Sequence, residues 1–218
     1  ELIGMKNIPA LDPKVLDLVT EISKEPKVEA AMAFIKDQTE VAMQEQIELC
    51  EIEAPTFHEE KRAASVAERM KQYGLTDVHI DEIGNVIGIR KGTGSGPVLA
   101  IGAHMDSVFP AGTDVKVKKE GNIYRAPGIG DNCSGLRALL QVLRAMEKED
   151  TRTVGDILFV GTVGEDGNGD IRGSKHLCTN NKLDGFVAID STDVGRVLYG
   201  AVGSHRWRLA VDGTGGHS

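Results

Sequence analysis

Residues 97–106 of the chain read "PVLAIGAHMD", an almost wholly apolar run that ends on a histidine and an acid. Such a run is typical of a strand buried on both faces, as strands are in a parallel sheet. It follows the Gly- and Ser-rich turn "KGTGSG" at 91–96 and precedes a long loop at 107–130. We therefore expect an inner strand here, which delivers His104 and Asp106 to the edge of the sheet where the strand ends.

Short apolar runs and helical patterns alternate on either side of this strand. Helical spacing of apolar residues predicts helices at 28–50, 131–149 and 171–180. Another helix is expected after Pro55, where Thr56 and Glu59 fit a capping box and Gly74 fits the residue after the helix end. The remaining strands are expected at 77–81, 85–91, 157–163, 185–189 and 196–202. This alternation predicts an α/β sandwich with a largely parallel sheet.

Composition narrows the class of protein. The 218 residues include 25 Lys and Arg against 33 Asp and Glu, for a net charge of -8, and no basic block is longer than "VKVKK". Nucleic acid and anionic membranes are therefore poor partners. No stretch approaches the roughly 20 apolar residues of a membrane span. The widely spaced Cys50, Cys133 and Cys178 predict free thiols in a reducing compartment, and we expect a cytoplasmic protein.

Polar residues follow each of the inner apolar runs. In an open α/β sheet, ligands bind beyond the carboxyl ends of the strands, so these side chains are expected to converge. Carboxylates packed that closely raise one another's pKa unless cations lie between them, which predicts one or two bound metals. One imidazole with several carboxylates suits zinc, manganese or cobalt better than calcium. The residues concerned are His104, Asp106, Asp131, Glu165, Asp166 and Asp190.

Two pairs within this set predict a division of roles. Asp106 lies two residues after His104, so on an extended strand both face the same way and the carboxylate can hold the second ring nitrogen. A simple turn acid is the alternative for Asp106. Glu165 and Asp166 are consecutive within "GTVGEDGNGDIRG" (161–173), where flanking glycines let one bind metal while the other takes a proton from water. A solvated turn is the alternative for that pair.

Five stretches in order resemble the M20-type family of dinuclear zinc metallopeptidases and amidohydrolases. That family includes tripeptide aminopeptidases, dipeptidases, aminoacylases and glutamate carboxypeptidases. The stretches are "AIGAHMDSV" (100–108), "GIGDNCSG" (128–135), "GTVGEDGNGDIRG" (161–173), "FVAIDS" (186–191) and "GTGGHS" (213–218). The resemblance implies a three-layer α/β sandwich with a mostly parallel mixed sheet, followed by the first part of a smaller α+β lid domain.

The resemblance also implies two divalent metal ions, zinc first, with manganese or cobalt as alternatives. Asp131 would bridge the two metals, His104 and Asp190 would complete the protein ligands of one, and Asp166 would bind the other. Relatives have Glu at the position of Asp166, so this side chain is one methylene shorter.

Three further roles follow from the resemblance. Asp106 would orient the histidine, and Glu165 would be the general base that activates water. His217 would bind the carbonyl oxygen of the substrate, often in the active site of the partner subunit of a homodimer formed through the lid.

Relatives continue beyond the position of His217 and return to the catalytic domain with a last histidine ligand. We therefore expect residues 1–203 to be the amino-terminal part of the catalytic domain and 204–218 the start of the lid.

The expected activity is hydrolysis of an amide bond in a small peptide or an N-acyl amino acid. Asp190 favours an aminopeptidase or dipeptidase, since relatives that act as carboxypeptidases or acylases tend to have Glu there. The alternative is a non-catalytic α/β remnant or regulatory protein that retains the fold.

Overall fold

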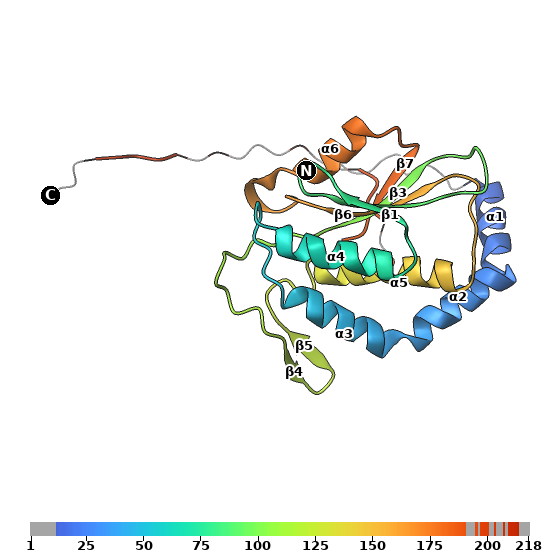
Figure 1. Ribbon diagram of the computed structural model, residues 1–218, viewed down its shortest axis with the longest axis horizontal. Coiled ribbons are helices and arrows are strands. Elements are labelled where there is room, and N and C mark those ends of the chain that lie inside the picture. The colour runs from blue at the N-terminus through green and yellow to red at the C-terminus, as the bar shows by residue number, and fades with distance from the viewer. Residues whose placement is uncertain are drawn as a thin grey trace, which may run out of the picture.

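A five-stranded mixed sheet forms the centre of the protein (Figure 1). The computed structural model describes residues 12–190, 195, 197–200, 203, 207 and 209–213. The strands follow the spatial order β1-β2-β6-β3-β7. Their bounds are β1 Asp77–Ile80, β2 Val86–Arg90, β3 Leu99–His104, β6 Ile157–Thr162 and β7 Gly185–Ala188.

The expected largely parallel sheet is confirmed. β3 pairs in parallel with both β6 and β7, so it is an inner strand as its apolar run predicts. β2 runs antiparallel to β1 and to β6 and is the one strand of this sheet that points the other way. The carboxyl ends of β3, β6 and β7 therefore lie at one edge of the sheet.

Helices cover both faces of the sheet, which gives the expected three-layer sandwich. Figure 1 shows α4 and α5 beneath the strands, α2 and α3 outside them, and α6 on the opposite face. The bounds are α1 Pro13–Ser23, α2 Pro26–Asp37, α3 Thr39–Cys50, α4 Glu60–Gln72, α5 Cys133–Lys148 and α6 Arg172–Asn180. No helix in the described part of the chain is both long and apolar enough to cross a bilayer.

Two apolar clusters hold the layers together. The larger joins α3, α4 and α5 to one face of the sheet and includes Met70, Leu139, Leu143 and Phe159, each with no exposed surface. The smaller lies on the other face, where Leu177 of α6 packs against strand residues. The apolar stripe of α5 faces the larger cluster, as its helical spacing predicts.

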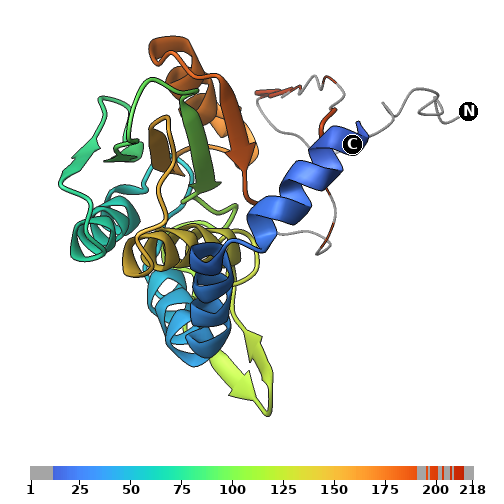
Figure 2. The ribbon, with the colours of Figure 1, turned by 90° about the vertical axis from the view of Figure 1, so that its right-hand side faces the viewer.

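Several expectations need correction. The helix expected at 28–50 is two helices that meet at Gln38, and α1 is an additional helix that was not expected and has no buried residue. The stretch expected to be a loop at 107–130 contains a hairpin of β4 Lys118–Glu120 and β5 Ile123–Arg125. This hairpin projects from the body of the protein, and α1 lies at the periphery of the protein (Figure 2). In the expected strand at 196–202, the described residues 197–200 are in no strand.

The prediction of a capping box at the start of α4 is also wrong. α4 begins at Glu60, and no side chain caps its first turn. Gly74 has a positive φ of 105° after the helix end, as expected. Instead, the hydroxyl of Thr56 donates to Oδ2 of Asp106, and the carboxylate of Glu59 accepts the backbone N–H of Gly164 in the turn after β6.

Leu139→Ala tests the contribution of α5 to the core. Leu139 has no exposed surface, so truncation leaves a cavity between α5 and the sheet. We expect a loss of about 3 kcal/mol in the free energy of unfolding, measured by urea denaturation of the full-length protein. The matched control is Lys148→Ala in the exposed last turn of α5, which should change stability little. Equal effects of the two changes would contradict this placement of α5.

Candidate active site

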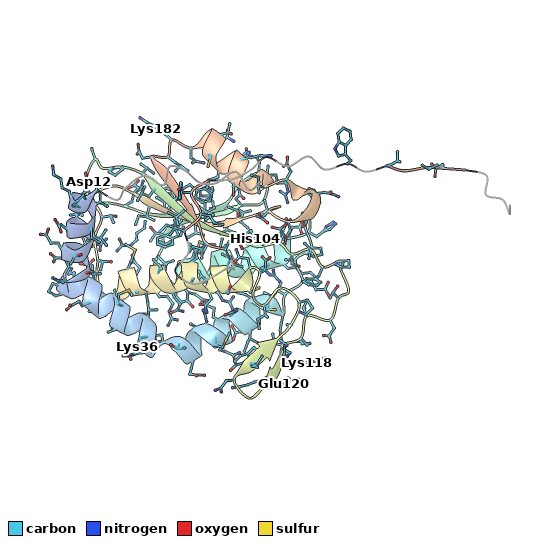
Figure 3. The ribbon with its side chains drawn as sticks, turned by 180° about the vertical axis from the view of Figure 1, so that it is seen from behind. Asp12, Lys36, His104, Lys118, Glu120 and Lys182 are labelled. Carbon is cyan, nitrogen blue, oxygen red and sulfur yellow. The ribbon has the colours of Figure 1, made fainter. Side chains whose placement is uncertain are left out.

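The polar residues predicted from the sequence converge at the carboxyl edge of the sheet. His104 is the last residue of β3, Glu165 and Asp166 follow β6, and Asp190 follows β7. Asp131 lies two residues before the first residue of α5. Figure 3 shows His104 well inside the outline of the protein, and its exposed fraction is only 3%. The parallel strands thus bring together residues that are far apart in sequence.

The two ring nitrogens of His104 face different partners. Nε2 lies 2.9 Å from Oδ1 of Asp131 and 3.9 Å from Oδ1 of Asp190. Nδ1 lies 3.1 Å from the backbone carbonyl oxygen of Asp106 and 3.4 Å from its Oδ1. This arrangement leaves Nε2 to face a ligand beside two carboxylates while Nδ1 is held from behind.

The carboxylate of Asp106 is fully buried and accepts hydrogen bonds from several donors. Oδ1 accepts the backbone N–H of Glu165 at 3.0 Å. Oδ2 accepts the backbone N–H of Asp166 at 3.0 Å and the hydroxyl of Thr56 at 2.9 Å. With His104 close to Oδ1 as well, the acceptor capacity of this carboxylate is used by the protein itself. Asp106 is therefore an anchor that joins β3 to the turn after β6.

Two groups of side chains have ligand atoms close enough to share a metal ion. One is His104, Asp131 and Asp190, and the other is His104, Asp106 and Asp166, each with ligand atoms within 4.8 Å of one another. The first group is the better candidate, because Asp106 in the second already holds protein donors. The carboxylates of Asp131 and Asp190 are also open to solvent, with side-chain exposures of 61% and 48%.

Burial and crowding shift the pKa of several of these groups. Burial opposes the charge on His104, but the hydrogen bond with Asp106 and the nearby carboxylates outweigh it and raise the pKa to about 9. Burial likewise works against ionisation of Asp106, yet His104 and the amides of the turn hold its pKa at about 2. Burial, reinforced by the neighbouring acids, raises the pKa of Asp166 to about 6 and also raises the pKa of Glu165. The group is thus short of positive charge, which a metal would supply.

The turn at 163–166 is held by its backbone. Its four consecutive N–H groups all donate to side chains, at 3.0 to 3.1 Å. Gly164 has a φ of 62°, and a Cβ there would lie 2.5 Å from Nε of Arg172, so a glycine is required. In order from Val163 to Asp166, the acceptors are Asn85, Glu59, Asp106 and Asp106 again.

The sequence did not reveal two residues that brace the site. Asn132 begins α5 by accepting the N–H of Gly135, and it also donates to the carbonyl oxygen of Ile189 at 2.9 Å, which links the segments of Asp131 and Asp190. The buried Arg62 donates to the carbonyl oxygen of Met105 at 2.7 Å, between His104 and Asp106. An Asn before a helix signals a cap, but its tertiary bond has no signal in the sequence.

The sequence model of peptidase family M28 matches residues 85–209, which include all the residues of this cluster. The chain belongs to peptidase family M28. Members of this family are metal-dependent, typically with zinc. The family match thus agrees with the cluster of imidazole and carboxylate ligands. The M20-type resemblance holds at the level of the shared aminopeptidase and dipeptidase fold, and the matching family model is M28.

Individual proteins are similar to this chain in sequence or in fold. A LysW-lysine/LysW-ornithine hydrolase of Pyrococcus abyssi is 34% identical over 120 residues, which is 55% of this chain and 32% of that protein. A tripeptidase from Staphylococcus aureus superposes with a TM-score of 0.58 at 30% identity, over 70% of this chain and 43% of that one. Aminopeptidase PepT from Bacillus cereus shares the fold with a TM-score of 0.60 at 24% identity, over 71% and 44%. The chain spans less than half the length of each of these three relatives.

Binding of zinc to the metal-free protein is expected to release protons. With its pKa raised to about 9, His104 is protonated at pH 7.5, and it must become neutral to bind metal through Nε2. We expect about one proton released per protein molecule at pH 7.5, because one histidine is a ligand, and more near pH 6, where Asp166 with a pKa of about 6 is partly protonated. Calorimetric titration in two buffers of different ionisation enthalpy measures this number.

The control for that titration is His79→Gln, because His79 is exposed on β1 away from the site. This change should leave the number of released protons as it is. Zinc binding without proton release at pH 7.5 would show that His104 is not a ligand or is already neutral.

Proposed function

We propose that the protein is a two-metal hydrolase that cleaves an amide bond in a small peptide or an N-acyl amino acid. One observation carries the proposal. Nε2 of His104 faces Asp131 and Asp190, while Nδ1 is held by Asp106, beside the carboxyl side chain of Glu165. A ligand set aimed at one point, with a base next to it, is the arrangement that metal-assisted hydrolysis needs.

The donor set fits zinc. One imidazole nitrogen and two carboxylates within 4.8 Å of one another match the nitrogen and oxygen ligands of catalytic zinc sites, which keep a position open for water or substrate. Asp131 and Asp166 are the residues that would hold the second metal. The backbone N–H of Asp166 donates to Oδ2 of Asp106 at 3.0 Å, so its backbone position is held although its side chain is one methylene shorter than Glu.

When bound, the metals would polarise the scissile carbonyl group and lower the pKa of water. Glu165 would take the proton of the attacking water and pass it to the amine nitrogen that leaves. Its raised pKa, caused first by burial, suits a group that must accept a proton and then give it up. Asp106 would keep the imidazole of His104 in one orientation throughout.

The substrate class is inferred from the relatives together with the site. One relative is by name a tripeptidase, and another is by name a hydrolase of LysW-lysine or LysW-ornithine. The first name supports a small peptide as the substrate, and Asp190 favours an aminopeptidase or dipeptidase. A homodimer through the lid, with substrate contact by His217, remains part of the proposal. His217 lies outside the described residues, and only residues 207 and 209–213 of the proposed lid start at 204–218 are described.

Glu165→Gln tests the role of the base. Gln keeps the shape of the side chain but cannot accept a proton, so we expect zinc to be retained and kcat to fall by about 10³-fold or more. The measurements are zinc content and hydrolysis of a panel of dipeptides, tripeptides and N-acyl amino acids by the full-length protein. Glu68→Gln, in an exposed position on α4, is the matched control.

Removal of metal from the same protein completes the test. Chelation should abolish hydrolysis and added zinc should restore it. A protein that binds no metal, or in which Glu165→Gln keeps full activity on every substrate cleaved, would contradict the proposal and favour a non-catalytic protein that retains the fold.

A further inference from the structure

Glu59, the buried acid before α4, holds the turn that carries Glu165 and Asp166. Its exposed fraction is 4%, and Oε1 accepts the backbone N–H of Gly164 at 3.0 Å. Both of its oxygens also accept hydrogen bonds from Nη2 of Arg172, at 2.9 and 3.0 Å. The turn is therefore fastened to the start of α4 through one charged side chain.

Arg172, the first residue of α6, completes this attachment from the other side. Its backbone N–H donates to the carbonyl oxygen of Gly164 at 3.2 Å, and its Nη1 donates to the carbonyl oxygen of Ile83 at 2.8 Å. The guanidinium also lies 5.1 Å from the ring centroid of Phe57. Gly164 is thus held at its N–H by the carboxylate of Glu59 and at its C=O by the backbone N–H of Arg172, and the side chains of these two residues form an ion pair with each other.

We propose that Glu59 and Arg172 are positioning residues of the active site, which set the direction of Glu165 and Asp166 by fixing Gly164. This inference rests on the proposed function, because it concerns how the base and the metal ligand are aimed. The two residues touch neither the expected metals nor the substrate in this role. They act through the backbone immediately before Glu165.

The geometry favours positioning over a direct electrostatic effect. Glu59 and Arg172 compensate one another, so the pair adds little net charge beside the site. The shape of the turn depends on them, since the side chain of Arg172 fills the space next to the positive φ of Gly164. Glu59 also precedes residues 85–209, so the family match does not extend to it. A displaced turn would misdirect two functional side chains at once.

Glu59→Gln in the full-length zinc protein tests the inference. Gln keeps the size of the side chain and one oxygen for Gly164, but it loses the charge that holds Arg172. We expect kcat to fall by about 10- to 100-fold with KM changed less than about twofold, and zinc affinity to fall by about 10-fold. Glu60→Gln, the exposed neighbour at the start of α4, is the matched control and should alter none of these values.

A double-mutant cycle separates positioning from a general loss of structure. If Glu59 acts through the direction of Glu165, adding Glu59→Gln to Glu165→Gln should lower the residual kcat by less than about twofold when zinc saturates both variants. A further 10- to 100-fold loss in that background, or a single variant Glu59→Gln with the kcat and zinc affinity of the wild type, would overturn the inference. If Glu59→Gln does not fold, Arg172→Lys serves the same test, since Lys keeps the charge but cannot reproduce the paired contacts.

The unmodified protein keeps the two proposals apart. If it binds zinc and cleaves peptides but Glu59→Gln and Arg172→Lys behave like it, only the positioning inference fails. If the unmodified protein neither binds zinc nor cleaves any substrate of the panel, the proposed function itself fails and the positioning inference is overturned with it.

Discussion

The rest of the site depends on the hydrogen bonds that the buried carboxylate of Asp106 accepts. This carboxylate joins the end of β3 to the turn after β6 by accepting two consecutive backbone N–H groups, and it also contacts Nδ1 of His104. A buried carboxylate is costly unless its oxygens are hydrogen-bonded, and here the donors include the backbone of the turn that carries Glu165 and Asp166. The contacts that stabilise the buried charge of Asp106 are therefore the same contacts that align the site.

Around this anchor, burial changes sharply over a short distance. Asp106 and His104 are buried, with exposed fractions of 0% and 3%, whereas the side chains of Asp131 and Asp190 are 61% and 48% exposed. The inner residues are fixed by protein partners, and the outer carboxylates face solvent. This gradient suits a site that receives metal and substrate from solution on a rigid base.

The sheet explains why a chain of this composition can gather so many acids. β3, β6 and β7 run in parallel, so their carboxyl ends deliver polar residues to one edge while their apolar faces lie under α5 and α6. Apolar periodicity predicted these strands and the faces of the helices, because burial on a regular backbone leaves a regular pattern. It did not predict the hairpin β4–β5, since three-residue strands with exposed side chains carry no such pattern.

A local sequence pattern predicted the wrong contacts where the same side chains form tertiary hydrogen bonds. Thr56 and Glu59 have the spacing of a capping box, yet neither caps α4, because the hydroxyl of Thr56 bonds to Asp106 and the carboxylate of Glu59 bonds to Gly164 and Arg172. All three partners come from distant parts of the chain. The buried amide of Gly164 needs an acceptor, and the carboxylate of Glu59 supplies it instead of capping α4.

The sequence by itself determined the α/β class, the inner strands and the residue types that gather at their ends. Buried strands leave apolar runs in the sequence, and the polar residues that follow each run can be identified directly. Only the tertiary structure decided which nitrogen of His104 faces Asp131, that Asp106 is an anchor and not a free ligand, and that Glu59 and Arg172 hold Gly164. These facts depend on distances between segments up to 113 residues apart. Hydrogen bonds are short and directional, so no one-dimensional pattern could fix them.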